Sequence, residues 1–271
     1  MRRIGATALL LFSCLAATTS CLAANNLERT TCGWREWLGF KLWLRAATQL
    51  DPGIDPPGAV PYLVTAMDGR KLHGYRLKAA GDNVGRVVLV IQGNAMTAAT
   101  IADAFWPFAQ AGYDVVIVDF RGYGKSEGIP RAKALLADNR QILVGLRQRY
   151  HNVYVYGLSL GAILAANLLD LDLDAYVLDS LPATLKSYGC PAAFDPINHL
   201  PANCSNLLVV SGGQDPIIKP AASEPLLARA SSCGATVVRR VQWSHPFMDY
   251  ATDQRVSSAL AFFRQIEAGE K

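Results

Sequence analysis

Short apolar runs alternate along the chain with longer stretches in which apolar residues recur every three or four positions. The short runs are typical of strands buried on both faces of a parallel sheet, and they lie at 86–91, 114–120, 153–156, 175–178, 207–210 and 236–240. The longer stretches predict helices at 98–111, 131–150, 160–169, 223–230 and 255–266. This alternation indicates a mostly parallel α/β sheet, with reactive groups gathered beyond the carboxyl ends of its strands.

Several segments depart from this rhythm. Residues 62–65 and 71–78 flank Asp68-Gly69, which predicts a hairpin of antiparallel strands at one edge of the sheet. Residues 51–61 form an irregular lead-in that is rich in proline and glycine, and residues 180–206 contain several prolines and two cysteines.

Residues 31–45 carry three tryptophans among basic side chains. This segment is either a helix packed on the sheet or an interfacial helix that lies on a membrane surface. Its apolar spacing is too irregular to decide. We prefer the packed helix and keep membrane-surface association as the alternative.

The first 24 residues have the pattern of an export signal, because Met1-Arg2-Arg3 precedes an apolar run that is too short for a membrane span. Cleavage beside Ala23-Ala24 would free the chain into the bacterial periplasm or the medium, whereas lipidation of Cys21 would anchor it; we expect the free form. The predicted divisions are the signal at 1–24, an N-terminal helix and lead-in at 25–61, and one α/β domain at 62–271.

The composition fits one domain with a large core, since 51% of the 271 residues are hydrophobic and 18% are charged. Loss of Arg2 and Arg3 with the signal lowers the formal net charge from +4 to +2, which is too small to indicate nucleic-acid binding. The sequence holds no metal-binding motif, so we expect no metal or other cofactor. The expected partner is a small-molecule or acylated substrate.

Four cysteines follow the signal, namely Cys32, Cys190, Cys204 and Cys233. An even number is compatible with two disulfides in an oxidising compartment, although four buried thiols remain the alternative. Three pairings are possible. The pair Cys190–Cys204 is the simplest, because it closes a short loop.

Gly157-Leu158-Ser159-Leu160-Gly161 lies between a predicted strand and a predicted helix. A turn this sharp exposes its central hydroxyl, and glycines on both sides avoid collisions. The backbone N–H of Leu160 opens the helix and points to where negative charge would develop on an attacked carbonyl oxygen. The pattern therefore predicts that Ser159 is a nucleophile.

A serine hydroxyl needs a base. Of the four histidines, only His245 comes late enough to follow an acid placed after the next-to-last predicted strand. Asp215 is that acid, and Asp179, at the end of the preceding strand, is its rival. The second donor to the oxyanion would be the N–H of Asn94, in the loop after the first parallel strand, with Ala95 N–H as the fallback.

The motifs and their order resemble the α/β-hydrolase superfamily, in particular its exported or membrane-proximal serine hydrolases of the serine-aminopeptidase-like branch. The residues that carry the resemblance lie at 65–74, 92–95, 119–128, 157–161, 213–217 and 245. The resemblance implies an α/β-hydrolase fold, with a mostly parallel central sheet, helices on both faces and a short lid segment. It also implies Ser159, Asp215 and His245 as the catalytic triad. Gln92 departs from the family, which usually has histidine before the Gly-Asn pair of this loop.

The activity that the resemblance implies is hydrolysis of an acyl bond through an acyl-enzyme, with a carboxylic ester as the first expectation. A thioesterase or an aminopeptidase-like amidase with the same triad, or a non-catalytic binding protein of the same fold, are the alternatives. The lid position at 180–206 offers only about 25 residues, so we expect a shallow or open site. Candidates for an apolar acyl pocket are Phe120, Tyr123, Phe247 and Met248.

Overall fold

The computed structural model describes residue 27 and residues 29–81 and 85–269. The export signal expected at 1–24, with Cys21, lies outside these described residues. None of the described helices combines the length and the apolar character that a membrane span requires.

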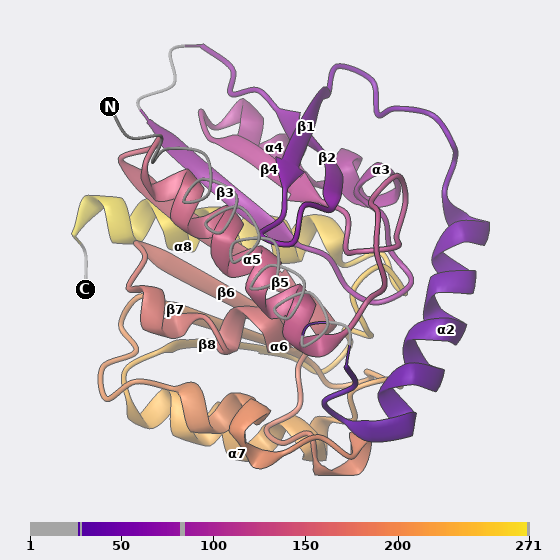
Figure 1. The fold of residues 1–271 in the computed structure, drawn as a ribbon. Helices are drawn as coiled ribbons and strands as arrows, with labels where there is room; N and C mark the ends of the chain where they lie inside the picture. Colours follow the sequence, from indigo (N-terminus) through magenta and orange to yellow (C-terminus); the bar gives the residue numbers. More distant parts are fainter. Residues whose placement is uncertain (1–26, 28, 82–84, 270–271) are drawn as a thin grey trace, which may run out of the picture.

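An eight-stranded sheet runs through the centre of the molecule in the order β1-β2-β4-β3-β5-β6-β7-β8 (Figure 1). Its strands are β1 Val60–Thr65, β2 Lys71–Leu77, β3 Arg86–Ile91, β4 Asp114–Val118, β5 Asn152–Leu158, β6 Ala175–Asp179, β7 Leu207–Gly212 and β8 Thr236–Arg240. β1 and β2 form the predicted edge hairpin, and β2 also runs antiparallel to β4. All other neighbours pair in parallel, which confirms the predicted sheet.

Helices cover both faces of this sheet (Figure 1). They are α2 Gly33–Leu50, α3 Ala98–Ile101, α4 Trp106–Gln110, α5 Ala132–Arg147, α6 Leu160–Ala166, α7 Pro220–Ser232 and α8 Thr252–Ala268, with 3₁₀ turns η1 Ala102–Phe105, η2 Leu169–Leu171, η3 Lys186–Tyr188, η4 Ala192–Phe194 and η5 Pro196–His199. α5, α6 and α7 bury one apolar cluster against the sheet, and α4, η1 and α8 bury a second cluster on the opposite face.

The helix predicted over 98–111 is not continuous. α3 ends at Ile101, the 3₁₀ turn η1 follows, and α4 begins at Trp106 with Pro107 in its first turn. A proline has no N–H and clashes with the preceding turn, so it can begin a helix but not continue one. The periodicity therefore predicted the correct buried face and missed the break.

The strand register brings the reactive loops to one edge of the sheet. Ile91 of β3 pairs with Gly157 of β5, and Leu158 pairs with Asp179 of β6. The N–H of Ser180, which follows β6, donates to Val210 O of β7 at 3.0 Å. The loops that leave β3, β5, β6 and β7 therefore start side by side, as expected for the ligand-binding edge of a parallel sheet.

Helix α2 is packed as predicted, but only along one of its sides. Phe40 and Ala47 join the apolar cluster on the α5–α6 face of the sheet. Trp34 and Leu42 are 69% and 60% exposed. Since successive helical residues are rotated by about 100°, Phe40 and Ala47 lie opposite Trp34 and Leu42. Two opposed apolar faces give no single helical period, which is why the spacing of this segment looked irregular.

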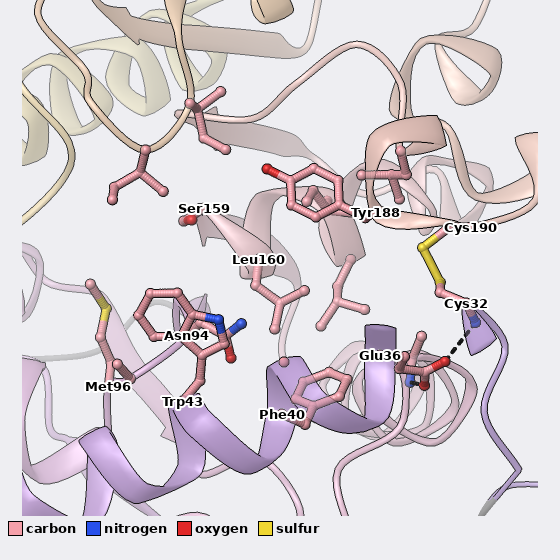
Figure 2. A pocket seen from close by; sticks show the side chains of 18 of the residues that line it. Cys32, Glu36, Phe40, Trp43, Asn94, Met96, Ser159, Leu160, Tyr188 and Cys190 are labelled. Atoms are coloured by element: carbon pink, nitrogen blue, oxygen red, sulfur yellow. Dashed lines mark hydrogen bonds between the residues drawn. A yellow bond between two sulfur atoms is a disulfide. The ribbon is translucent and has the colours of Figure 1, made fainter. Parts of the chain in front are cut away.

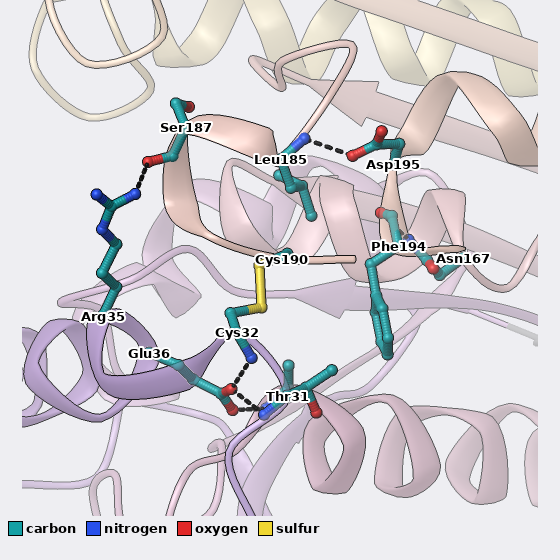
Figure 3. The surroundings of a disulfide bond; sticks show 11 residues. Thr31, Cys32, Arg35, Glu36, Asn167, Leu185, Ser187, Cys190, Phe194 and Asp195 are labelled. Atoms are coloured by element: carbon teal, nitrogen blue, oxygen red, sulfur yellow. Dashed lines mark hydrogen bonds between the residues drawn. A yellow bond between two sulfur atoms is a disulfide. The ribbon is translucent and has the colours of Figure 1, made fainter. Parts of the chain in front are cut away.

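The four cysteines form two disulfides, as expected, but the predicted pairing of Cys190 with Cys204 was wrong. Cys32 pairs with Cys190, and Cys204 pairs with Cys233. Cys190 lies beside the start of α2 (Figure 3), where Arg35 Nη1 also donates to Ser187 O at 3.1 Å. Cys204 lies beside the C-terminal end of α7, and its N–H donates to Cys233 O at 2.7 Å. Separation along the chain was a poor guide because α2, which is distant in sequence, and α7, which follows β7, both pack against the proline-rich segment.

We predict that the Cys32–Cys190 disulfide stabilises the fold more than the Cys204–Cys233 disulfide. The chain-entropy model gives about 5 kcal/mol for a bond spanning 158 residues and about 3.5 kcal/mol for one spanning 29 residues. The double variants Cys32→Ala/Cys190→Ala and Cys204→Ala/Cys233→Ala should therefore differ in free energy of unfolding, measured with guanidinium chloride, by about 1.5 kcal/mol. Equal losses from the two pairs would contradict this prediction.

Candidate active site

Ser159 stands alone between β5, which ends at Leu158, and α6, which begins at Leu160. Its φ of 52° and ψ of −109° lie in a region that residues with a side chain rarely occupy. The adjoining glycines leave no room for a substitute, because a Cβ on Gly157 would lie 2.6 Å from Gly161 O and one on Gly161 would lie 1.9 Å from Ile91 O. The turn therefore holds Ser159 in a strained backbone conformation and presents its side chain to the cavity, as the sequence predicts.

The side chains of Asp215 and His245 are hydrogen-bonded to each other. His245 Nδ1 lies 2.8 Å from Asp215 Oδ2, and both side chains are buried. The other carboxylate oxygen, Oδ1, accepts the N–H groups of Ile217 and Ile218 at 2.9 and 2.8 Å. A carboxylate can only accept, so Nδ1 of His245 is the donor and Nε2 is left free to take a proton.

The environment of Asp215 keeps its carboxylate charged. Burial raises its pKa, but the hydrogen bonds from His245, Ile218 and Ile217 outweigh this effect, and the pKa lies below its ordinary value of 3.8. An ionised Asp215 holds the His245 ring in one tautomer.

The rival acid, Asp179, has different partners. It accepts hydrogen bonds from Tyr156 at 2.9 Å and Ser180 at 3.0 Å, and it pairs with Arg255 of α8. Arg255 also donates to Ser244 O, directly before His245, and its guanidinium lies 4.8 Å from the Trp243 ring centroid. The buried Asp179–Arg255 pair thus supports the loop that carries His245, a role for which the sequence contained no signal.

Ser159, Leu160, Asn94 and His245 line one cavity of about 580 Å³. Figure 2 shows Ser159, Leu160 and Asn94 together on it, with the side chains of α2 facing them. Four of the predicted site residues therefore line the same cavity, and Asp215 is joined to them through its hydrogen bond with His245.

The loop after β3 is held by side chains of its own neighbourhood. Gln92 Nε2 donates to Met96 O at 2.9 Å, and Tyr123 Oη donates to Asn94 Oδ1 at 2.9 Å. Gln92 therefore supports this loop although it replaces the histidine usual in the family. Ala95 has a φ of 58°, so the turn itself is strained.

More than the short segment after β6 surrounds the cavity. Its lining is mostly apolar and comes from α2, α5, α6, the loops after β3 and β7, the segment after β6 and the loop after His245: Phe40, Trp43, Leu50, Met96, Leu136, Leu160, Ile163, Leu164, Leu185, Phe194, Ile217, Ile218, Phe247 and Met248. Phe247 and Met248 line it as expected, whereas Phe120 and Tyr123 are buried in the apolar core. α2 adds a wall that sequence order did not assign to the site.

Glu36 holds the N-terminal end of α2 in place. Its carboxylate accepts the N–H of Thr31, of Cys32 at 2.7 Å and of Ala132, the first residue of α5, at 2.8 Å. A carboxylate at a helix N-terminus also interacts favourably with the helix dipole. With the Cys32–Cys190 disulfide beside it (Figure 3), Glu36 ties α2 to both α5 and the segment after β6.

A second buried acid lies behind the loop after β3. Asp119 Oδ1 accepts the N–H of Ala98, the first residue of α3, at 2.6 Å, and a Cβ on Gly124 would lie 2.2 Å from its other oxygen. Burial raises the pKa of Asp119 to about 7, even though the Ala98 hydrogen bond acts in the opposite direction. Within residues 27, 29–81 and 85–269, no group of three or more His, Cys, Asp or Glu side chains could hold a metal ion.

Several known proteins are similar in sequence to parts of this chain. The family model described as serine aminopeptidase, S33, matches residues 82–179. The chain is 30% identical over 154 residues to the uncharacterised protein YfhR of Escherichia coli, which covers 50% of this chain and 51% of YfhR. It is 33% identical over 114 residues to human alpha/beta hydrolase domain-containing protein 17B, which covers 37% of this chain and 39% of that protein. The aligned region thus spans about half or less of these curated relatives.

Solved structures match more of the chain. The Pyrococcus furiosus esterase Pf2001 superimposes with a TM-score of 0.61 at 19% identity, covering 76% of this chain and 92% of that chain. Thermogutta terrifontis esterase 2 superimposes with a TM-score of 0.66 at 17% identity, covering 79% and 97%. The topology and these likenesses define an α/β-hydrolase fold. In its fold and in these matched segments the chain is similar to the α/β-hydrolase superfamily, which its motifs also resemble.

We predict that Asp119 makes the fold less stable as the pH rises. Its pKa is about 7 in the folded chain and about 3.9 in an unfolded chain, so the folded state binds the extra proton between these values. The stability contributed by the protonated carboxyl is complete below about pH 4 and is lost as the pH rises through about 7.

The variant Asp119→Asn imitates the protonated acid and can still accept the Ala98 N–H. Its urea midpoint, relative to wild type, should therefore increase between pH 4 and about pH 7 and level off above that pH. Asp103→Asn, which changes an exposed acid of η1, is the charge-matched control. A constant difference between Asp119→Asn and wild type across this range would refute the prediction.

Proposed function

We propose that the chain is a serine hydrolase that cleaves acyl bonds, carboxylic esters first, with Ser159 as nucleophile, His245 as base and Asp215 as the acid that orients it. The observation that carries the proposal is the 2.8 Å hydrogen bond between His245 Nδ1 and Asp215, at a cavity that Ser159 and His245 share. This is the constellation that activates a serine hydroxyl in acyl transfer.

In the proposed reaction, His245 Nε2 takes the proton of Ser159 as the serine oxygen attacks the carbonyl carbon of the ester. The N–H groups of Leu160 and Asn94 would stabilise the resulting oxyanion, and one such donor is typically worth about a hundredfold to a thousandfold in rate. The tetrahedral intermediate collapses, the alcohol leaves with the proton from His245, and an acyl-serine remains. Water, deprotonated by His245, then releases the acid and restores Ser159.

Proteins of the same fold support an ester as the substrate. The solved neighbours from P. furiosus and T. terrifontis are named esterases, and T. terrifontis esterase 2 is phosphorylated by paraoxon. A thioester or an amide would be attacked by the same groups, and a non-catalytic binding protein would have no need of the ionised Asp215 behind His245.

Export is the second part of the proposal. The two disulfides support it, since disulfides form and persist in oxidising compartments. Together with the signal pattern at 1–24 they favour the bacterial periplasm or the medium, with a lipid anchor at Cys21 as the alternative.

We predict that the triad variants lose esterase activity while the fold persists. Ser159→Ala and Asp215→Asn should each lower kcat for p-nitrophenyl butyrate by about a thousandfold or more, the first by removing the nucleophile and the second by releasing the His245 ring. Ser187→Ala, another serine that lines the cavity, is the matched control and should keep wild-type activity. Mass spectrometry of the paraoxon-treated chain should locate the phosphoryl group on Ser159. Undiminished hydrolysis by Ser159→Ala would sink the assignment.

We also predict a preference for longer acyl chains. Each methylene that enters the apolar cavity gains up to about 0.8 kcal/mol, or about fourfold in kcat/KM. The ratio of kcat/KM for p-nitrophenyl octanoate to that for the acetate should therefore be large in wild type. It should fall in Ile163→Trp, which fills part of the cavity, and not in Val144→Trp, an exposed position of α5. Equal ratios in both variants would show that the acyl chain lies elsewhere.

A further inference from the structure

The outward side of α2 is apolar and exposed. Trp34, Trp37 and Leu42 are 69%, 48% and 60% exposed, and Leu38 and Lys41 lie between them. These five residues, which we call the outer face, are spaced by three, four, seven and eight positions from Trp34, and this spacing places them on one side of a helix. Contiguous apolar surface of this kind on a monomer typically marks an interaction site.

The exposed charges on α2 are all positive. Arg35, Lys41 and Arg45 are exposed, whereas Glu36, the one acid among residues 33–50, is buried on the inner side of the helix. Lys41 Nζ lies 5.1 Å from the ring centroid of Trp37, and the Arg35 guanidinium lies 5.7 Å from that of Trp34. Tryptophan beside long basic side chains is the pattern of helices that lie in a lipid interface, where the stems follow the apolar layer and the cations reach anionic headgroups.

The charge pattern favours a lipid surface over a second copy of the chain as the partner of the outer face. A two-fold contact through the outer face would bring Lys41 and Arg45 of one copy toward the same cations of the other, and like charges that face each other across an interface weaken it. An anionic lipid surface supplies the missing counter-charge and accommodates the tryptophan rings together.

The opposite side of the same helix forms a wall of the cavity. Phe40, Trp43 and Leu50 line it, and Trp43 and Leu50 are also 42% and 65% exposed, so they join the cavity to the surface of the molecule. The Cys32–Cys190 disulfide and the hydrogen bond from Ala132 to Glu36 hold α2 in place. α2 is therefore a rigid element with acyl-sized space on one side and an interfacial face on the other.

We infer that the outer face docks the protein on an anionic lipid surface, and that the acyl chains of lipid-embedded esters reach Ser159 along Trp43 and Leu50. The docking stands on the exposed face alone; the choice of substrate rests on the function proposed above. α2 lies parallel to the surface, with its outer face in the headgroup layer and its inner face toward the cavity.

The test uses the full chain carrying Cys21→Ser, which removes any acyl anchor, and Ser159→Ala, which removes catalysis. It is sedimented with sucrose-loaded vesicles of phosphatidylcholine alone or of equal parts phosphatidylcholine and phosphatidylglycerol. We expect binding to the mixed vesicles, weakened in 1 M salt because the screening length falls to about 3 Å. Trp37→Ser/Leu42→Ser should weaken it about tenfold, since each loses an interfacial anchor. Leu63→Ser/Met67→Ser, exposed on the hairpin, is the matched control and should bind like the parent.

Three results would overturn the inference: equal binding of the outer-face variant and its control, binding to phosphatidylcholine that matches binding to the mixed vesicles, or a dimer by light scattering that Trp37→Ser/Leu42→Ser dissolves. With Ser159 restored, the outer-face variant should hydrolyse soluble p-nitrophenyl butyrate like wild type and a vesicle-embedded long-chain ester about tenfold more slowly. Vesicle binding without any esterase activity would sink the proposed function and leave the docking intact. Esterase activity without vesicle binding would refute the docking and leave the proposed function intact.

Discussion

The approach of the first turn of α6 to the end of β3 is the constraint on which the rest of the site depends. A Cβ on Gly161 would lie 1.9 Å from Ile91 O, so only a bare backbone can pass there. β5 must therefore turn into α6 within one residue, and Ser159 takes up the strained backbone that results. A hydroxyl held this way has one direction, and the cavity, the His245 loop and the covering helix are all arranged around it.

Buried charged side chains hold the loops around the Ser159 hydroxyl in place. Removing a charge from water is costly unless a partner compensates it, so each buried pair restricts how its two segments can sit. Asp179 and Arg255 join the end of β6 to α8 behind His245. Glu36 joins α2 to the start of α5, and Asp119 joins the end of β4 to α3. Loops that differ widely in sequence position are thereby held at one edge of the sheet.

The covering of the cavity is assembled from two segments that lie far apart in the chain. The segment after β6 is short, as expected, but it is bonded through Cys190 to Cys32 at the start of α2. Leu185 N–H donates to Asp195 at 2.6 Å and Asn167 donates to Phe194 O at 3.1 Å, which hold that segment over the end of α6 (Figure 3). An N-terminal helix outside the sequence motifs therefore supplies part of the lining of the cavity.

The sequence by itself determined the strands, most helices, the turn at Ser159 and the fold class, because these depend on local periodicity and on short motifs whose geometry is set by neighbouring residues. It also singled out His245 and Asp215 through their order along the chain. Only the tertiary structure decided the partners of Cys190 and Asp179 and the place of α2. Pairing between distant segments depends on how the chain crosses the sheet, and a helix with two opposed apolar faces carries no single period that reveals which face turns inward.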